Sequence, residues 1–269
     1  MAGDLTHDAM HEYYSQGREQ GRLAEPHGQL EFERTKEIIL RHLPPPPAVV
    51  ADVGGGPGRY ALWLAGLGYQ VTHRDLMRLH VEQLQLAADG NSRIEAALGD
   101  ARQLDLASDS VDAVLLLGPL YHLEQRADRL RALAEARRVV RPGGPVYAVA
   151  ISRWAPRMDG VLRSRFYETI PAVELELPAI ERTGRLPPLY AGSFCGYTHR
   201  PGQLRAEVAA SGLQVIDLVS VEGPAYLLDD LAERLADEES RQVVFETARS
   251  VERVPELLGI GPHLLATAR

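Results

Sequence analysis

The chain has 269 residues, of which 45% are hydrophobic and 25% charged, and its formal net charge is −8. This composition is typical of one large globular domain. The acidic balance argues against a long groove for nucleic acid, which needs many Lys and Arg side chains to neutralise phosphates. No apolar run approaches the roughly 20 residues that span a bilayer, so no membrane partner is expected. The single cysteine, Cys195, cannot form an internal disulfide, which favours a cytoplasmic location.

Residues 1–43 are predicted to form two helical pieces, broken around Pro26-His27-Gly28. The second piece carries apolar residues at roughly helical spacing, namely Leu30, Ile38, Ile39 and Leu43. The proline run at 44–47 then ends the helix, because proline has no N–H to donate and its ring clashes with the preceding turn. We expect this N-terminal segment to form a helical lid.

A short apolar run then ends in an acid and a glycine-rich turn, Val49-Val50-Ala51-Asp52-Val53-Gly54-Gly55-Gly56-Pro57-Gly58. The run predicts a buried parallel strand, and residues 59–65 predict the start of a helix. Glycine is needed where backbone turns tightly and approaches a ligand, because a Cβ obstructs both. In a dinucleotide-binding G-x-G-x-x-G motif counted from Gly54, the third glycine would fall on Arg59. The spacing therefore disfavours an NAD(P)-dependent oxidoreductase.

Strands and helices alternate after this turn. Strands are predicted over residues 69–73, 93–98, 111–117 and 146–151, and helices over 80–88 and 128–140. The turn Arg141-Pro142-Gly143-Gly144 ends the second of these helices. Such βαβ alternation predicts an α/β fold, a doubly wound and mostly parallel sheet with helices on both faces.

Residues 152–200 interrupt the alternation and are too long for a bare loop, so we interpret them as an inserted lid with a helical middle over 162–181. The alternation returns with a helix over 203–211, a strand over 213–219, a largely helical stretch over 231–251 and a last strand over 263–267. The predicted organisation is an N-terminal helical lid (1–43), a core (44–151), an inserted lid (152–200) and the C-terminal part of the core (201–269).

The pattern D-x-G-x-G-x-G at Asp52–Gly58 resembles motif I of class I S-adenosylmethionine (SAM)-dependent methyltransferases, and the resemblance extends over most of residues 48–150. It implies a Rossmann-like methyltransferase fold with a seven-stranded sheet, SAM as cofactor and S-adenosylhomocysteine as product. It also implies that Asp75 binds the ribose hydroxyls, that Asp100 accepts from the adenine amine, and that the amide of Ala101 meets a ring nitrogen. A helix N-cap at Asp75 and a plain turn at Gly99-Asp100 are the structural alternatives. The implied cofactor-binding set is Asp52, Gly54, Gly55, Gly56, Gly58, Asp75, Leu76, Asp100, Ala101 and Gly118.

The segment Gly118-Pro119-Leu120-Tyr121-His122-Leu123 follows the fourth strand and resembles a segment of many bacterial small-molecule methyltransferases. Amino-methylating relatives carry Asp/Asn-Pro-Pro-Tyr here, and Gly118 lacks that side-chain acceptor, which argues against methylation of nucleic-acid bases. Tyr121 and His122 are the candidate catalytic residues, with His122 as a general base. The alternative is that His122 holds the loop backbone.

Acceptor contacts are expected from the two lids, because the core is occupied by the cofactor motifs. The proposed substrate-binding residues are Tyr14, Arg18, Tyr197 and His199, with Tyr13, Arg22, Trp154 and Tyr167 as further candidates. The alternative for each residue taken alone, and the one that general expectation favours, is a surface or packing role. The stretch from Tyr197 to Pro201 is expected to close the pocket from above. No group of Cys, His, Asp or Glu has metal-ligand spacing, so no metal is expected.

The predicted function is methyl transfer from SAM to an O, N or C nucleophile of a small molecule, in specialised metabolism. The first alternative keeps the cofactor but uses it for a non-methylating step such as cyclisation. The second is an NAD(P)-dependent oxidoreductase, and the third is a non-catalytic binding protein. A small-molecule acceptor and a second copy of the chain in a homodimer are the partners considered.

Overall fold

Strands β1 to β5 form the parallel part of a central sheet in the computed structural model, which describes residues 12–15, 17, 19–170, 172–189 and 193–269. The strands are β1 (Val49–Val53), β2 (Gln70–Asp75), β3 (Ile94–Leu98), β4 (Ala113–Leu116) and β5 (Val146–Ser152). Their order is β3-β2-β1-β4-β5, and every neighbouring pair is parallel. The glycine-rich turn therefore leaves the middle of the sheet.

Two antiparallel pairings complete this sheet beside β5. Strand β9 (His263–Ala268) pairs with β5 over its whole length, and β8 (Val215–Ser220) pairs with β9. The order β3-β2-β1-β4-β5-β9-β8 confirms the predicted mostly parallel core, and the two further strands described next bring the described sheet to nine strands instead of the predicted seven.

The segment predicted as an insertion also supplies two short strands that the sequence pattern did not predict. Strand β7 (Gly196–His199) pairs in parallel with the end of β5, and β6 (Arg185–Leu186) pairs with β7. Ile151 of β5 pairs with His263 on one side and Thr198 on the other, beyond the point where β4 ends. The helical middle predicted over 162–181 is broken into a π-helical turn (Met158–Arg163), a 3-10 turn (Phe166–Glu168) and α8 (Ala172–Thr183).

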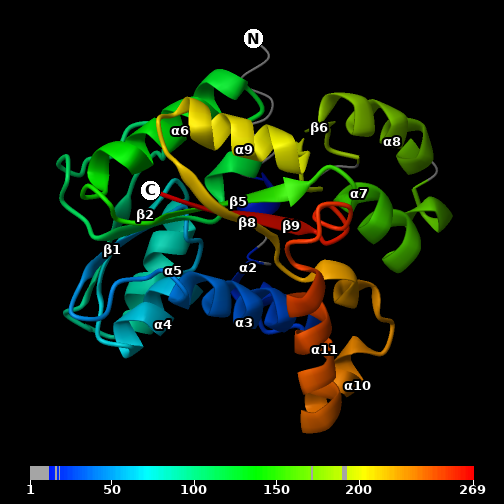
Figure 1. The fold of residues 1–269 in the computed structure, drawn as a ribbon, viewed down its shortest axis with the longest axis horizontal. Helices are drawn as coiled ribbons and strands as arrows, with labels where there is room; N and C mark the ends of the chain where they lie inside the picture. Colours follow the sequence, from blue (N-terminus) through cyan, green and yellow to red (C-terminus); the bar gives the residue numbers. More distant parts are fainter. Residues whose placement is uncertain (1–11, 16, 18, 171, 190–192) are drawn as a thin grey trace.

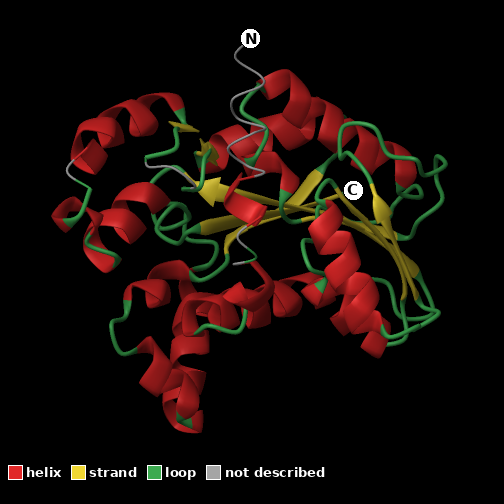
Figure 2. Ribbon diagram, turned by 180° about the vertical axis from the view of Figure 1, so that it is seen from behind, coloured by secondary structure: helices red, strands yellow, loops and turns green. Residues whose placement is uncertain are grey.

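Helices cover both faces of the sheet (Figures 1 and 2). Alternate strand residues point to opposite faces, so Val50 and Leu115 join the core under one helix layer, whereas Ala51 and Leu116 join the core under the other. The first layer consists of α3 (Pro26–Leu40), α4 (Arg59–Gly66) and α5 (Arg78–Ala88), and the second of α6 (Arg126–Val139) and α9 (Pro201–Ala210). The remaining helical pieces are α2 (Glu19–Arg22), α7 (Ala155–Arg157), α10 (Leu231–Ala236), α11 (Glu238–Val251) and 3-10 turns at Pro119–Tyr121 and Gly223–Leu227.

The break between the two N-terminal helical pieces lies directly before Pro26-His27-Gly28, because α2 ends at Arg22 and α3 begins at Pro26. Proline suits the first position of a helix, where its missing N–H would have no partner in any case. A Cβ at Gly28 would lie 2.1 Å from the backbone oxygen of Arg22, so glycine at this position allows the two helices to approach closely.

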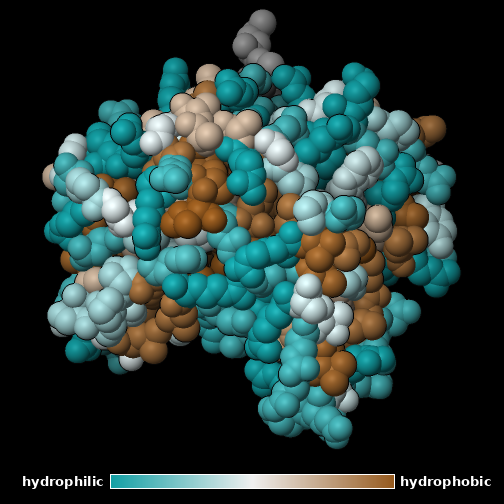
Figure 3. Space-filling view, viewed as in Figure 1, coloured by the Kyte–Doolittle hydropathy of each residue, from teal (hydrophilic) through white to brown (hydrophobic). Residues whose placement is uncertain are grey.

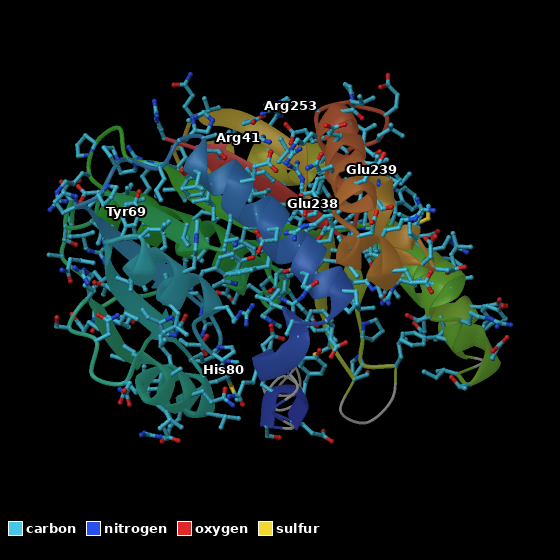
Figure 4. The ribbon with its side chains drawn as sticks, turned by 90° about the horizontal axis from the view of Figure 1, so that it is seen from below. Arg41, Tyr69, His80, Glu238, Glu239 and Arg253 are labelled. Atoms are coloured by element: carbon cyan, nitrogen blue, oxygen red, sulfur yellow. The ribbon has the colours of Figure 1, made fainter. Side chains whose placement is uncertain are left out.

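A buried ion-pair network ties α3 to the end of α11. The Nη2 of Arg34, a residue with no exposed surface, donates to Oε2 of Glu252 over 2.5 Å, and Nη1 of Arg41 donates to Oε1 over 2.8 Å. Figure 4 shows Arg41 and Arg253 where α3 meets α11. The network fixes α3, which carries residues of the pocket described below.

Hydrophilic side chains cover most of the face in Figure 3, and hydrophobic ones form separate patches. Within the described part of the chain, no helix has both the length and the apolar character of a membrane span.

Candidate active site

A pocket lies at the carboxyl ends of β1, β2, β3 and β4, where open α/β sheets bind ligands. Its walls include most of the predicted cofactor set, namely Gly54, Gly55, Gly56, Asp75, Leu76, Asp100, Ala101 and Gly118. We call this part the donor end. The pocket continues to residues of α2, α3 and β9, which we call the inner end.

The glycine turn is tightly packed at the donor end. Gly54 and Gly56 have φ values of +65° and +59°, which side chains other than glycine rarely adopt. A Cβ at Gly54 would lie 2.6 Å from Cγ of Pro119, and one at Gly118 would lie 2.6 Å from the backbone oxygen of Gly54. The strands β1 and β4 thus bring two backbone segments together with room for a ligand but not for side chains.

Two predicted cofactor residues support the turn instead of lining the pocket. Asp52 is fully buried, and its Oδ2 lies 3.2 Å from Nδ1 of His73. A Cβ at Gly55 would lie 2.2 Å from this carboxylate, so Asp52 occupies the space beneath the turn. Gly58 precedes α4, where a Cβ would lie 2.4 Å from Leu84.

Asp75 is buried and accepts three hydrogen bonds. The donors are the backbone N–H of Gly56 (2.9 Å), the backbone N–H of Met77 (2.8 Å) and Nδ1 of His80 (3.1 Å). Burial by itself raises the pKa of Asp75, but the hydrogen bond and charge of His80 outweigh it and lower the pKa below its ordinary value. An ionised carboxylate has about four acceptor positions, so one remains for a ligand hydroxyl.

Asp100 and Ala101 line the same end at the turn after β3. The Nη2 of Arg102 donates to Oδ2 of Asp100 over 2.6 Å, and the backbone N–H of Arg102 donates to Oδ1 over 2.8 Å. An adenine amine would therefore share the carboxylate of Asp100 with Arg102. Together with the glycine cradle and Asp75, these residues fit a bound nucleoside.

His122 lies in the pocket wall beside Tyr14 of the helical residues 12–15. Burial lowers the pKa of His122 to about 4, so the ring is neutral near pH 7. Burial also raises the pKa of Tyr14, so its hydroxyl keeps its proton and donates to Nε2 of His122 over 2.7 Å. We therefore assign the proton of the ring to Nδ1, which has no hydrogen-bond partner among the described residues. This geometry makes His122 a weak base.

Tyr14 is a predicted substrate-binding residue that lines the pocket. Its ring makes edge-to-face contacts with the ring of His80 and with the ring of His122. Figure 4 shows His80 on the side where the N-terminal helices lie. Arg18 lies outside the described residues. Among the further candidates, Arg22 also lines the pocket.

Tyr197 and His199 require a correction, because β7 places them in the core and not in the pocket wall. Nε2 of His199 lies 3.2 Å from Oε2 of Glu207, and the ring of Tyr197 lies 3.7 Å from the guanidinium of Arg129. Arg129 also donates to both carboxylate oxygens of Glu207. These residues hold α6, α9 and β7 together. The polar character of Tyr197 and His199 suggested a ligand site, because the sequence pattern does not predict strand β7.

The inner end combines Arg22 with three ionisable residues that the sequence pattern did not single out, Glu31, Glu222 and His263. Both terminal nitrogens of Arg22 donate to Glu31, and Nδ1 of His263 donates to Oε1 of Glu222 over 2.6 Å. The Oε2 of Glu31 lies 4.0 Å from Nδ1 of His263. Burial by itself lowers the pKa of His263, but the carboxylates of Glu222 and Glu31 raise it to about 9. A signal was available, since Glu222 and His263 adjoin the last two predicted strands.

Glu31, Glu222 and His263 bring atoms of metal-ligating kinds within 4.8 Å of one another. Arg22, however, already occupies both oxygens of Glu31, and His263 donates to Glu222. The ligating atoms of Glu31 and Glu222 are thus already engaged in ion pairs and hydrogen bonds. We therefore interpret Glu31, Glu222 and His263 as an ion-pair cluster.

Comparisons with known proteins agree with this geometry. The model of the methyltransferase domain family matches residues 51–148. The ubiquinone/menaquinone biosynthesis C-methyltransferase UbiE of Acidiphilium cryptum is 34% identical over 122 residues, which cover 44% of this chain and 48% of that protein. The chain spans about half the length of the curated relatives it matches.

Solved structures show the same fold. A SAM-dependent methyltransferase from Methanosarcina mazei has a TM-score of 0.58 and 18% identity, covering 86% of this chain and 95% of that one. The [4+2]-cyclase SpnF has a TM-score of 0.54 and 20% identity, covering 87% and 79%. Residues 51–148 thus match the methyltransferase domain family, and the chain has the fold of the solved SAM-dependent methyltransferases.

Proposed function

We propose that the protein is an enzyme that transfers a methyl group from SAM to an O, N or C nucleophile of a small molecule. The observation that carries this proposal is the pocket itself, in which the glycine turn, Asp75, Asp100 and Gly118 share one wall. SAM supplies an electrophilic methyl group on a sulfonium, which is a good leaving group. The protein therefore needs mainly to orient and desolvate the reactants, and orientation contributes about 7–11 kcal/mol in favourable systems.

We assign the donor-end residues as follows. Asp75 accepts from a ribose hydroxyl, and Asp100 and Ala101 contact the adenine ring. Leu76, whose side chain is 39% exposed, offers it an apolar surface. Gly54 and Gly118 let the donor approach the backbone closely. Tyr121 and His122 line the same pocket, and we assign the inner end to the acceptor.

A small molecule suits the inner end better than a polymer, because residues of α2 and α3 wall the pocket there. The matching segment of a relative named as a C-methyltransferase is compatible with this acceptor class. A homodimer and a cytoplasmic location are further parts of the proposal, and light scattering of the purified chain tests the first.

The decisive test of the cofactor is calorimetric titration of SAM into the wild type and Gly56→Leu. Position 56 requires a positive φ, and such strain in a non-glycine residue costs about 1–3 kcal/mol. We expect the substitution to weaken SAM binding by roughly tenfold or more, since the side chain would also enter the pocket. Gly66→Leu is the matched control, because a Cβ there meets nothing within 4 Å. Equal affinity of Gly56→Leu and the wild type would contradict the assignment.

A non-methylating reaction is the alternative, suggested by the fold shared with the cyclase SpnF. Methyl-labelled SAM separates the two functions. Label recovered in the product supports methyl transfer, and a rearranged product with the label still in SAM supports the alternative.

A further inference from the structure

Glu222 fixes one nitrogen of His263 and leaves the other available. Glu222 is 1% exposed and receives both the backbone N–H of His263 (3.3 Å) and its Nδ1 (2.6 Å). Because an ionised carboxylate only accepts, Nδ1 must carry the hydrogen. The Nε2 atom of His263 has no hydrogen-bond partner in the described part of the chain. A histidine oriented by a carboxylate in this way can accept a proton at the opposite nitrogen.

His263 also lines the same pocket as the residues of the donor end. It lines the inner end of the pocket together with Glu31, and Glu31 interacts electrostatically with Tyr121. The hydroxyl of Tyr121 in turn lies 3.6 Å from the Cβ position of Gly118. A ligand between Tyr121 and His263 would therefore touch both the residues near the methyl group and the imidazole.

We propose that His263 is a catalytic residue that takes the proton lost by the acceptor, with Glu222 as its positioning residue. This proposal rests on the proposed function. The acceptor X–H forms a bond from X to the methyl carbon, and the bond from that carbon to sulfur breaks. The electron pair of the broken bond stays on sulfur, giving S-adenosylhomocysteine. The proton of X–H passes to Nε2 of His263, and Glu222 stabilises the resulting imidazolium.

The charges at the inner end define the acceptor class. When His263 is neutral, as a proton acceptor must be, the three carboxylates of Glu19, Glu31 and Glu222 outnumber, in the described part of this end, the two cations of Arg22 and of Arg59, which lines the same pocket from the start of α4. Like charges repel strongly where water is excluded. The site therefore suits a neutral or cationic compound with a hydroxyl or amino group and rejects carboxylates and phosphates.

The strength of His263 as a base fits acceptors that carry a hydroxyl or amino group. The charged groups that act on His263 are Glu222, Glu31 of α3 and Arg22 of α2, and the Tyr60 hydroxyl of α4 interacts with the same two carboxylates. Their balance raises the pKa of His263 to about 9. Phenols and amines have pKa values of about 10, so proton transfer between them and His263 is nearly balanced.

The first experiment is an NMR titration of the full chain with ¹⁵N-labelled histidine, using His263→Gln to assign the signals. We expect the Nδ1–H form of His263 to titrate near pH 9, and Glu222→Gln to move this midpoint at least one pH unit lower. An Nε2–H form, or a midpoint below about 6.5, the ordinary histidine value, would overturn the proposal.

The second experiment measures transfer of labelled methyl to catechol, benzyl alcohol and benzylamine, with benzoate as the anionic counterpart. We expect the wild type to label at least one of the first three and not benzoate, at a rate that rises with pH up to about 9. His263→Gln should lose about 10²–10⁴-fold in rate while SAM affinity is unchanged. Added imidazole should partly restore His263→Gly. His42→Gln, at the end of α3 and away from the pocket, is the control.

The outcomes separate the two proposals. Failure of the wild type to bind SAM contradicts the proposed function. SAM binding without labelling of any probe overturns the acceptor class, and a wild-type rate in His263→Gln overturns the role of the histidine. A rate that needs an added divalent cation would also overturn it, because Nδ1 and the carboxylates would then bind the metal.

Discussion

Gly54 and Gly118 face each other at the residue scale, and each lacks a side chain because backbone or proline occupies the space that a Cβ would need. The same turn depends on Asp52, whose carboxylate lies under Gly55. The Asp-x-Gly-x-Gly-x-Gly pattern thus combines two requirements, a left-handed backbone and a buried acid below it. Gly54, Gly55 and Gly56 line the pocket, whereas Asp52 and Gly58 are not among its lining residues.

His122 is neutral and held by Tyr14, so we expect it to affect turnover without setting the pH profile. His122→Ala removes a polar group from the wall next to the acceptor, and turnover should fall by about tenfold or more with little change in SAM affinity. Because burial lowers the pKa of His122 to about 4, its charge does not change between about pH 6 and 9. Steady-state kinetics measures the turnover of His122→Ala, and calorimetry of the same variant measures its SAM affinity. Equal losses of turnover and affinity would indicate a structural role.

At the scale of elements, β7 matters more for stability than for the pocket. It places His199 beside Glu207 of α9, and Arg129 of α6 pairs with the same carboxylate. Burial by itself raises the pKa of Glu207, but the hydrogen bonds of Arg129 and His199 lower it to about 2. A depressed pKa means that the contribution to stability is present above the ordinary value of 4.5 and is lost as pH falls towards 2.

Removing this carboxylate should therefore destabilise the protein while leaving SAM binding intact. Glu207→Gln leaves the buried Arg129 without its charge partner, a change that costs about 3–5 kcal/mol in comparable buried pairs. Denaturant unfolding at pH 7 measures the loss, and the difference from the wild type should shrink as the pH approaches 2. Glu239→Gln, at an exposed position of α11, is the control and should change stability by less than about 0.5 kcal/mol. A Glu207→Gln variant as stable as the wild type would show that the pair contributes nothing.

At the scale of the whole molecule, the pocket joins parts of the chain from Tyr14 to His263. The core strands supply the donor end, whereas α2, α3 and the start of β9 supply the inner end. The Arg34–Glu252 pair holds α3 against the C-terminal region and so couples the inner end to the rest of the fold. Ligand binding across these parts should stabilise the native state as one unit.

Thermal unfolding tests this coupling. A ligand at about 100 times its Kd stabilises the native state by about 2.7 kcal/mol. For a domain of this size, S-adenosylhomocysteine should therefore raise the Tm by roughly 5–10 °C in the wild type. Gly56→Leu should show a much smaller rise and Gly66→Leu a normal one. A single transition is expected, and two separate transitions would contradict the coupling.

The sequence by itself determined the parallel core, the cofactor and eight residues that line the donor end, whereas the other two of the ten predicted cofactor residues, Asp52 and Gly58, do not line it. These features follow from local sequence patterns. A hydrophobic run of strand length indicates a strand, closely spaced glycines indicate a turn with positive φ, and the residues that follow a strand indicate the edge of the sheet. Parallel strands bring their carboxyl ends to one edge of the sheet, so the sequence alone predicts that Asp75 and Asp100 share a site.

Only the tertiary structure decided the place of β7, the partner of His122 and the pairing of Glu222 with His263. The polar strand β7 has no hydrophobic run, and its position depends on the side of β5 that β4 leaves open. The charged groups of the inner end come from distant segments and are stabilised as ions only by one another. Charge pairing of this kind has no local pattern in sequence, because it arises when packing excludes water around groups that the fold has brought together.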